Sequence, residues 1–512
     1  MRYYLGLDNG GTTTKAALFN QKGEEVCVAS TETRMLIPQP GFIERDMEEM
    51  WGANCQVIKR VIKSSGIDPK NIAGVAVCGH GKGLYLWGKN GRPARPGIIS
   101  TDNRAYEYPL RWKENGVEPL AFKLSYQHIL ACQPVSLLAW LLDNEPEVTD
   151  NIEWIFECKD YIRFRLTGEA YGEITDYSGT SLINLYTGTY DDKLIGLFGL
   201  EKLRKALPPL RRSMDICGYV TGDAAAECGL TAGTPVAGGM FDIDACAVAV
   251  NVLSEKNICM IAGTWSINEY IRREPVVDGS ILMNSLFCLP GYYLIEECSP
   301  TSAGNNEWFI KTFLQEAIKL ERINGERIYD QINENVGRIP AQEFCPIFFP
   351  FLMASNVHPN AKGCFLGISN YHTRTHFLRG IYEGIAYSHK YHLEKLLRTT
   401  PAAPESIRLA GGVAHSKVWT QIFADVTGFP VETVKVNETG ALGCAIAAAV
   451  AVGDYADIME AADNMCSIAH AVEPISANIS AYQEKYELYM KSIFALDAVW
   501  DDYRNLYERM VI

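Results

Sequence analysis

The chain has 512 residues, of which 47% are hydrophobic and 21% charged, and it carries 61 acidic against 47 basic side chains, a net charge of −14. Single hydrophobic cores stop growing near about 250–300 residues, so this length predicts two domains. The composition excludes collagen-like, coiled-coil and disordered classes. An acidic chain without a Lys/Arg cluster is poorly suited to nucleic acid or an anionic membrane, so we expect neither as a partner.

The first thirty residues predict a three-stranded antiparallel meander. Apolar side chains alternate over residues 3–7, a Gly/Thr turn follows, and residues 16–19 form a second apolar run, with a third strand expected at 26–29. A dinucleotide-binding fold would instead begin with a strand, a glycine-rich loop and a helix.

Helical periodicity is visible in several later segments. Residues 46–64 and 375–397 are amphipathic, and a helix beginning at a proline is expected over 134–142. Small residues over 441–452 suit a closely packed helix. The tail over 480–510 is expected to form one long amphipathic helix or two shorter ones.

The strand, Gly-Thr turn and strand of the N-terminus recur over residues 258–267, about half the chain later. Such a repeat indicates two copies of one α/β unit. Because Gly-Thr is a common dipeptide, coincidence is the alternative. From the repeat we predict that residues 1–247 form the first domain and residues 248–512 the second.

The first turn is a candidate phosphate site. Glycines allow backbone N–H groups to approach phosphate oxygens, and threonine hydroxyls add donors. A carboxylate at the strand end has the chemistry to bind Mg²⁺, and a lysine nearby to neutralise phosphate charge. The alternative is a tight hairpin whose aspartate caps its own turn. The residues concerned are Asp8, Gly10, Gly11, Thr12, Thr13 and Lys15.

Two further glycine pairs precede polar residues. Asp242 follows Gly238-Gly239 at an expected helix start, where a carboxylate has access to a hydroxyl proton, although Asp242 or Asp244 would equally serve as a helix N-cap. Gly411-Gly412 ends an apolar strand, and such a turn lets a flat ring lie against the backbone. A plain connecting loop is the alternative there.

The 15 cysteines are an odd number without a CxxC pair, and the N-terminus becomes polar and glycine-rich at once. This pattern favours reduced thiols over disulfides or a zinc site, and it gives no sign of an export signal. We therefore expect a cytoplasmic location.

In their order and spacing these motifs resemble the FGGY family of carbohydrate kinases over nearly the whole chain. The resemblance implies an α/β fold with two duplicated actin/hexokinase-like (ribonuclease H-like) domains and a central cleft. It rests on residues 8–15, 79–84, 100–105, 159–161, 166–169, 178–180, 238–242, 262–265, 411–425 and 438–443.

Within the family the chain is most similar to L-xylulose kinases. The shared segments include residues 81–84, 101–105 and 134–138. Where D-xylulose kinases usually carry Gln-Met-His-Gly, this chain has residues 80–83, beginning with His80, which is also not the usual residue of L-xylulose kinases.

The resemblance implies a role for each candidate residue. Asp242 is expected to be the general base facing the acceptor hydroxyl, and Asp8 the Mg²⁺-side carboxylate. Expected sugar contacts are His80, Lys82, Asp102 and Asp242. Expected ATP contacts are Gly10, Gly11, Thr12, Thr13, Lys15, Gly263 and Thr264 for the phosphates, and Gly411, Gly412 and Ser416 for adenosine.

The predicted activity is therefore ATP- and Mg²⁺-dependent phosphorylation of a ketopentose, with L-xylulose as the expected substrate. Alternative acceptors are D-xylulose, ribulose, 3-keto-L-gulonate, erythritol and gluconate. A sugar sensor on the same fold should lack Asp8 or Asp242, and an actin- or Hsp70-like ATPase should lack Lys82 and Asp102. Homodimers occur among relatives, but no segment marks an interface.

Overall fold

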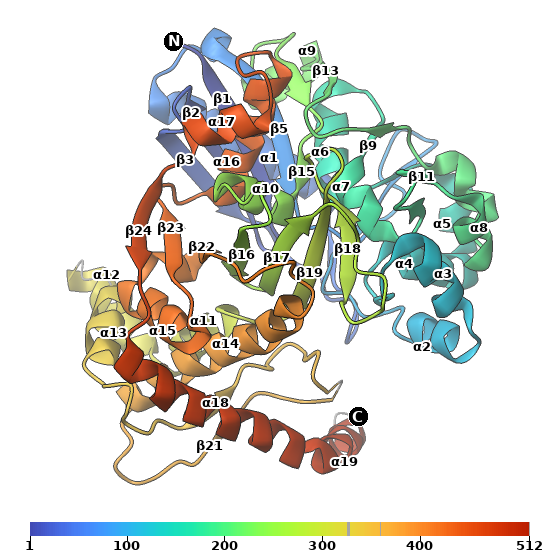
Figure 1. Ribbon diagram of the computed structural model, residues 1–512. Helices are drawn as coiled ribbons and strands as arrows, with labels where there is room; N and C mark the ends of the chain where they lie inside the picture. The colour runs from blue at the N-terminus through green and yellow to red at the C-terminus, as the bar shows by residue number, and fades with distance from the viewer. Residues whose placement is uncertain (325–327, 359, 511–512) are drawn as a thin grey trace. The chain divides into compact units, whose positions relative to one another are not determined.

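The computed structural model describes residues 1–324, 328–358 and 360–510 (Figure 1). The chain divides into two compact units. Unit 1 consists of residues 1–253, 271–295 and 435–467, and unit 2 of residues 254–270, 296–434 and those from 468 onward.

The sheet of unit 1 begins with the predicted meander. Strands β1 (Tyr3–Asn9), β2 (Thr13–Asn20) and β3 (Glu25–Glu32) are antiparallel neighbours. On the other side of β1, strand β5 (Ile72–Gly79) runs parallel to it and β14 (Pro235–Ala237) parallel to β5. Strand β13 (Ile216–Tyr219) closes the order β13-β14-β5-β1-β2-β3, and the short β15 (Met240–Phe241) pairs with the end of β5.

The second main sheet repeats this arrangement. Its order is β18 (Met283–Leu286), β19 (Tyr293–Ser299), β17 (Ser266–Arg272), β16 (Asn257–Ala262), β22 (Ser406–Ala410), β23 (Val431–Val434) and β24 (Ile468–Val472). The pairs β16–β17 and β23–β24 are antiparallel, whereas β16–β22 and β22–β23 are parallel. Because β16 and β17 match β1 and β2 in place and direction, the predicted internal duplication is confirmed.

Hydrophobic side chains of β1, β2, β3 and β5 form one core of unit 1 together with those of helix α1 (Met47–Ser65). The amphipathic pattern predicted this helix, and Asp46 caps it by accepting hydrogen bonds from the N–H groups of Glu48 and Glu49. The other helices of unit 1 are α2 (Glu107–Glu114), α3 (Val117–Ser125), α4 (Pro134–Asn144), α5 (Pro146–Asn151), α6 (Cys158–Thr167), α7 (Ile174–Tyr177), α8 (Asp192–Leu197), α9 (Gly222–Cys228), α10 (Asp242–Ala249), α16 (Thr439–Ala451) and α17 (Ile458–Met465).

Helix α16 is the predicted small-residue helix, and close packing explains its composition. A Cβ on Gly6 of β1 would lie 1.9 Å from the Ala441 carbonyl oxygen, and one on Gly443 would lie 2.1 Å from the Ala245 carbonyl oxygen of α10. Larger residues would therefore push α16 away from both β1 and α10.

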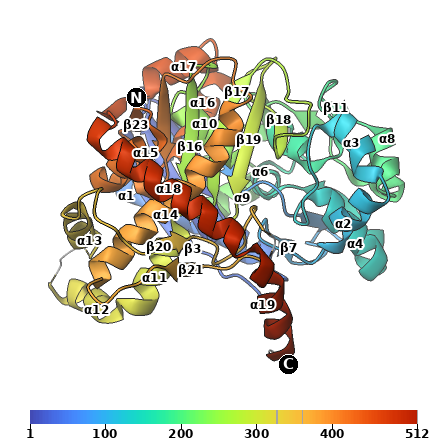
Figure 2. The same cartoon turned by 60° about the horizontal axis from the view of Figure 1, so that its bottom comes forward.

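Unit 2 places helices against its own sheet, among them α14 (Arg374–Leu397) and α15 (Lys417–Thr427). The predicted tail is two helices, α18 (Ser476–Ala495) and α19 (Asp497–Met510), and α18 lies across α14 and α15 (Figure 2). The remaining helices of unit 2 are α11 (Gly304–Phe313), α12 (Gln315–Asn324) and α13 (Ile328–Gly337).

Short two-stranded pairings lie outside the main sheets. In unit 1 they are β4 (Glu44–Arg45) with β7 (Gly97–Ile98), β6 (Tyr85–Gly88) with β8 (Ile152–Phe156), β9 (Gly172–Glu173) with β12 (Leu210–Arg211), and β10 (Ile183–Asn184) with β11 (Thr189–Tyr190). In unit 2, β20 (Ile347–Phe349) pairs with β21 (Cys364–Leu366).

Candidate active site

The carboxyl ends of three neighbouring strands carry the polar residues predicted for unit 1. In the parallel register, Asp8 of β1 and Met240 of β15 both lie beside Cys78 of β5. Asp242 follows β15 directly and starts α10. Parallel strands bring their carboxyl ends to one edge, the usual place for a ligand in an α/β sheet. Asp8 and Asp242 therefore flank the end of β5.

Asp8 is half-buried and lies opposite Lys15 in the first hairpin. Burial raises the pKa of Asp8; Lys15 opposes that shift and Glu438 adds to it. Lys15 Nζ donates to Glu438 Oε2 at 2.7 Å. Burial lowers the pKa of Lys15, but Glu438 and Asp8 outweigh it, so the Lys15 ammonium stays charged.

The turn between these strands is closed by its backbone, because Gly10 N–H donates to the Thr13 carbonyl at 3.1 Å. Because this bond joins two backbone groups, the turn does not need the Asp8 side chain as a cap. The alternative in which Asp8 caps its own turn therefore gains no support. Gly10, Gly11 and Thr13 are half-buried and Thr12 is exposed. A Cβ on Gly11 would meet no atom within 4 Å, so open space faces this side of the turn.

Sequence reasoning missed Arg45, which lies beneath this turn. Its Nη2 donates to the Gly10 carbonyl at 3.1 Å and to the Gly11 carbonyl. The side chain is 1% exposed. In a trans peptide the N–H group points opposite to the carbonyl. The N–H groups of Gly11 and Thr12 therefore point away from Arg45. No local pattern around residue 45 indicated this contact, because it joins segments far apart in the sequence.

Asp242 is half-buried, and the N-cap of α10 is Phe241, without a capping side chain. The N-cap alternative is therefore wrong for both Asp242 and Asp244. Burial raises the pKa of Asp242 well above its ordinary value, and the charges of Asp8 and Asp176 raise it further while Lys82 lowers it. Asp244 is fully buried. Of the two, Asp242 is the carboxylate with access to a ligand.

His80, Gly81 and Lys82 follow β5 and lie next to Asp242. Lys82 has a left-handed backbone (φ 61°), and its Nζ lies 5.3 Å from the centre of the Phe241 ring. His80 Nε2 lies 2.8 Å from the Tyr85 hydroxyl. Burial and then the charge of Arg45 lower the pKa of His80 to about 3, so this imidazole is neutral.

Asp102 is surrounded by protein donors. Its Oδ2 accepts from the Ile43 N–H at 2.6 Å and from Arg104 Nη2 at 2.9 Å, and its Oδ1 accepts from Arg104 N and Nε, both at 2.9 Å. The Asp102 side chain has no exposed surface. A sugar contact for Asp102 stays a prediction, and a ligand would have to replace one of these bonds.

Asp176 is a further carboxylate next to the site that the sequence motifs did not assign. A Cβ on Gly81 would lie 2.7 Å from Asp176 Oδ1 and 2.4 Å from the Phe241 ring. Lys159 Nζ, with no exposed surface, lies 3.3 Å from Asp176 Oδ2. Lys159 also pairs with Asp160 and Glu173 at 3.1 and 3.4 Å. The lysine of the sequence segment 159–161 therefore neutralises a buried carboxylate cluster beside Asp242.

In unit 2 the second Gly-Thr turn meets the diglycine motif. Gly411 follows β22, has φ 88°, and a Cβ there would lie 2.7 Å from the Ala262 carbonyl and 3.3 Å from the Gly263 nitrogen. Only glycine fits this position. The carboxyl ends of the parallel strands β16 and β22 thus bring Gly263, Thr264 and Gly411 together.

Gly412 begins a single 3-10 turn (Gly412–His415), and Ser416 is the N-cap of α15. Ser416 Oγ accepts from the Trp419 N–H at 3.2 Å and donates to Asn333 Oδ1 at 2.7 Å. The hydroxyl of Ser416 thus has a capping role that its predicted adenosine role did not include. Gly412 is exposed, and a Cβ added to it would meet no atom within 4 Å.

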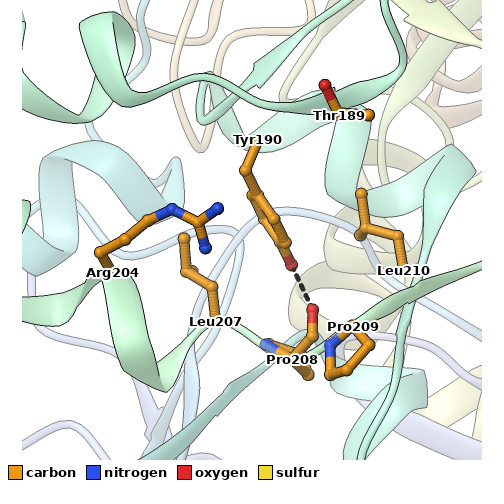
Figure 3. A pocket seen from close by; sticks show the side chains of 7 residues that line it. All are labelled: Thr189, Tyr190, Arg204, Leu207, Pro208, Pro209 and Leu210. Atoms are coloured by element: carbon orange, nitrogen blue, oxygen red, sulfur yellow. Dashed lines mark hydrogen bonds between the residues drawn. The ribbon is translucent and has the colours of Figure 1, made fainter.

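A pocket of about 400 Å³ lies elsewhere in unit 1 (Figure 3). It is lined by Thr189, Tyr190, Arg204, Leu207, Pro208, Pro209 and Leu210. The Tyr190 hydroxyl donates to the Pro208 carbonyl at 2.8 Å. The lining contains none of the predicted site residues and no carboxylate, so we assign no chemistry to it.

The residues around Asp8 suit Mg²⁺. Within the described ranges, no group of three or more His, Cys, Asp or Glu side chains is arranged to hold a metal ion. A metal at Asp8 would be bound by one carboxylate with water and phosphate oxygens, which is a common donor set of Mg²⁺ in kinases. None of the helices in the described part of the chain has the length and apolar character needed to cross a bilayer.

Comparison with known proteins matches both halves of the chain to one family. Residues 3–249 match the N-terminal domain, and residues 258–452 the C-terminal domain, of the FGGY family of carbohydrate kinases. The chain belongs to this family. It is therefore a sugar kinase, and the resemblance seen in the sequence motifs is confirmed. Kinases of this family use ATP.

Two relatives match this chain over almost their whole length, and their names indicate the sugars on which they act. A probable L-xylulose kinase of Pasteurella multocida is 36% identical over 503 residues, covering 98% of this chain and 100% of the relative. The L-xylulose/3-keto-L-gulonate kinase of Escherichia coli is 37% identical over 502 residues and 97% of each chain. The crystal structure of a ligand-bound xylulose kinase from Lactobacillus acidophilus has a TM-score of 0.86 at 22% identity, covering 98% and 100%. That structure confirms the actin/hexokinase-like fold.

Proposed function

We propose that this FGGY kinase transfers the γ-phosphate of ATP to a hydroxyl of L-xylulose. The placement of Asp242 beside Asp8 and Lys82, at the carboxyl ends of β1, β5 and β15, carries the proposal. The full-length relatives named for L-xylulose support the choice of sugar.

In this proposal Asp242 orients the acceptor hydroxyl and takes its proton as the new phosphate ester bond forms. The raised pKa of Asp242 makes its carboxylate a stronger base than an exposed aspartate. The hydroxyl oxygen attacks the γ-phosphorus, the bond to the bridging oxygen breaks, and ADP leaves. Phosphoryl transfer needs mainly positioning and charge neutralisation, which one base and a set of backbone and cationic donors supply.

The donor side in this proposal is the turn of Gly10, Gly11, Thr12 and Thr13 with Lys15, and in unit 2 the turn of Gly263 and Thr264. Lys15 neutralises phosphate charge while Glu438 holds its ammonium group. Asp8 would hold Mg²⁺, which neutralises charge on the phosphate oxygens when bound. Adenosine is assigned to Gly411, Gly412 and Ser416.

The sugar is assigned to His80, Lys82 and Asp102 together with Asp242. Because His80 is neutral and hydrogen-bonded to Tyr85, it would contact a neutral hydroxyl rather than an anionic group. Lys82 is the cation of this set. It would suit a keto oxygen or the carboxylate of 3-keto-L-gulonate, the second acceptor named for the E. coli relative. We therefore propose 3-keto-L-gulonate as the alternative substrate.

The division into domains at 247/248, a cytoplasmic location and a homodimer stay predictions. Product analysis tests the proposed reaction. Incubation with Mg-ATP and L-xylulose should give one phosphorylated pentulose, identified by ³¹P NMR and mass spectrometry, in equal amount to ADP. ADP without phosphorylated sugar would contradict the proposal and favour an ATPase.

A further inference from the structure

A buried chain of polar side chains in unit 2 connects helix α14 with strand β17 and the segment after β19. His389 Nδ1 lies 3.0 Å from Asn268 Oδ1, and His389 Nε2 lies 2.9 Å from Ser302 Oγ. Asn268 and His389 have no exposed surface, and Ser302 is 1% exposed. The ring of Phe423 from α15 packs edge-on against the imidazole, with 5.2 Å between ring centres.

The direction of each hydrogen bond follows from the chemistry of the groups. Asn268 Nδ2 donates to the Glu297 carbonyl at 3.3 Å, so Asn268 Oδ1 faces His389 and can only accept. His389 Nδ1 must therefore carry the proton. Burial and then His392 lower the pKa of His389 to about 3, so the ring is neutral and Nε2 accepts. Ser302 consequently donates its hydroxyl proton to His389.

Ser302 in turn holds the second Gly-Thr turn. Its main-chain N–H donates to the Thr264 carbonyl at 3.0 Å, and its own carbonyl accepts from the Asn305 N–H at 3.0 Å. Every polar group of Ser302 thus has a protein partner. The Thr264 side chain itself is exposed.

We propose that His389 and Asn268 are positioning residues for nucleotide binding, because they fix Ser302 and, through its main-chain N–H, the orientation of the Gly263-Thr264 turn. The inference rests on the proposed phosphate role of that turn. A small displacement of donors weakens their bonds to a phosphate group, because hydrogen-bond strength depends steeply on geometry. The helix α14 would then contribute to ATP affinity without touching ATP.

Two test variants and one control variant examine this role. Ser302→Ala removes the hydroxyl but keeps the main-chain N–H bonded to Thr264, and His389→Leu removes the ring. His392→Leu is the matched control, because His392 is on the same helix, 1% exposed, and bonds Glu297 Oε2 at 3.0 Å instead of Ser302. The dissociation constant of Mg-ATP is measured by isothermal titration calorimetry, which needs no turnover.

Ser302→Ala and His389→Leu should raise the dissociation constant of Mg-ATP about 3- to 10-fold, the cost of one hydrogen bond. The KM of the sugar should change less than about twofold, and His392→Leu should lower thermal stability without changing nucleotide affinity. An equal effect of His389→Leu and His392→Leu, or no effect of either, would overturn the positioning role. In the unmutated protein, ¹⁵N NMR showing the proton of His389 on Nε2 would also overturn it.

Thr264→Ala separates this inference from the function proposed above. If Thr264→Ala weakens Mg-ATP and His389→Leu does not, the positioning role alone is overturned. If Thr264→Ala has no effect either, the phosphate assignment of the turn is overturned together with the inference. Failure of every sugar to act as acceptor, with these affinities as expected, would overturn the substrate proposal alone.

Discussion

Asp8 and Lys15 lie directly opposite each other across the first hairpin, and the pair of Asn9 and Thr14 separates them from the turn that Gly10 and Thr13 close. Lys15 also donates to Glu438 Oε2 at 2.7 Å. One lysine is therefore held between two carboxylates that belong to different segments of unit 1. The arrangement places a fixed positive charge beside a glycine-rich turn.

Lys15→Met should reduce kcat/KM for ATP about 10- to 100-fold, because a charge-assisted hydrogen bond contributes about 1.5–3 kcal/mol. Glu438→Gln keeps the lysine and should reduce kcat/KM less than Lys15→Met does. Steady-state kinetics with varied ATP at saturating sugar measures both. A larger loss for Glu438→Gln would show that the carboxylate, not the lysine, serves the nucleotide.

Asp242→Asn should reduce kcat about 10²–10⁴-fold, the typical contribution of a positioned base, and leave the affinity for Mg-ATP close to normal. Asp244→Asn is the matched control two residues further along α10. The Asp244 side chain is fully buried, so its replacement leaves the exposed face of the site unchanged. We expect Asp244→Asn to retain activity. The reverse result would exchange the roles of the two aspartates.

Stability should depend on the protonation of Asp176. Burial raises its pKa from 3.8 to about 7, against the opposing charge of Lys159. Between these values the folded chain holds a proton that the unfolded chain has lost, so the free energy of unfolding falls as pH rises. Asp176→Asn should make this fall smaller. Urea unfolding at both ends of the interval measures it, and equal slopes in the two proteins would contradict the assignment.

Gly81→Ala should damage the site because its Cβ would lie 2.4 Å from the Phe241 ring and 2.7 Å from Asp176 Oδ1. Overpacking of this kind costs about 1–3 kcal/mol, and shifting Phe241 moves Asp242, its neighbour. Gly179→Ala is the control, since its Cβ would meet no atom within 4 Å. Thermal unfolding and turnover should both fall in Gly81→Ala and change little in Gly179→Ala.

Periodicity and turn chemistry predicted the elements well. The first meander, helices α1, α4, α14 and α16, and the second hairpin are all confirmed. The local sequence is sufficient to predict these elements, because apolar residues recur every second position on a half-buried strand and every three to four positions on a half-buried helix. The tail illustrates the limit, since the pattern left one helix or two open, and the structure shows one helix that ends at Ala495 and another that begins at Asp497.

Contacts between distant segments could not be predicted. Arg45 of β4 bonds the carbonyls of Gly10 and Gly11, and Lys159 pairs with carboxylates from α6, β9 and α7. The chain of Asn268, His389 and Ser302 joins β17, α14 and the segment after β19 in the same way. Such contacts depend on tertiary packing, whereas Asp8, Asp242 and Gly411 were recognised because each stands at a strand end with a glycine signature.

The most direct test of the proposed function is sugar-dependent ADP release with Mg-ATP across L-xylulose, D-xylulose, L- and D-ribulose, 3-keto-L-gulonate, erythritol, glycerol and gluconate. We predict the highest kcat/KM with L-xylulose, followed by 3-keto-L-gulonate, and loss of both rates in Asp242→Asn. A preference for D-xylulose, glycerol or gluconate would contradict the substrate proposed here, and no release with any sugar while ATP still binds would contradict a catalytic role.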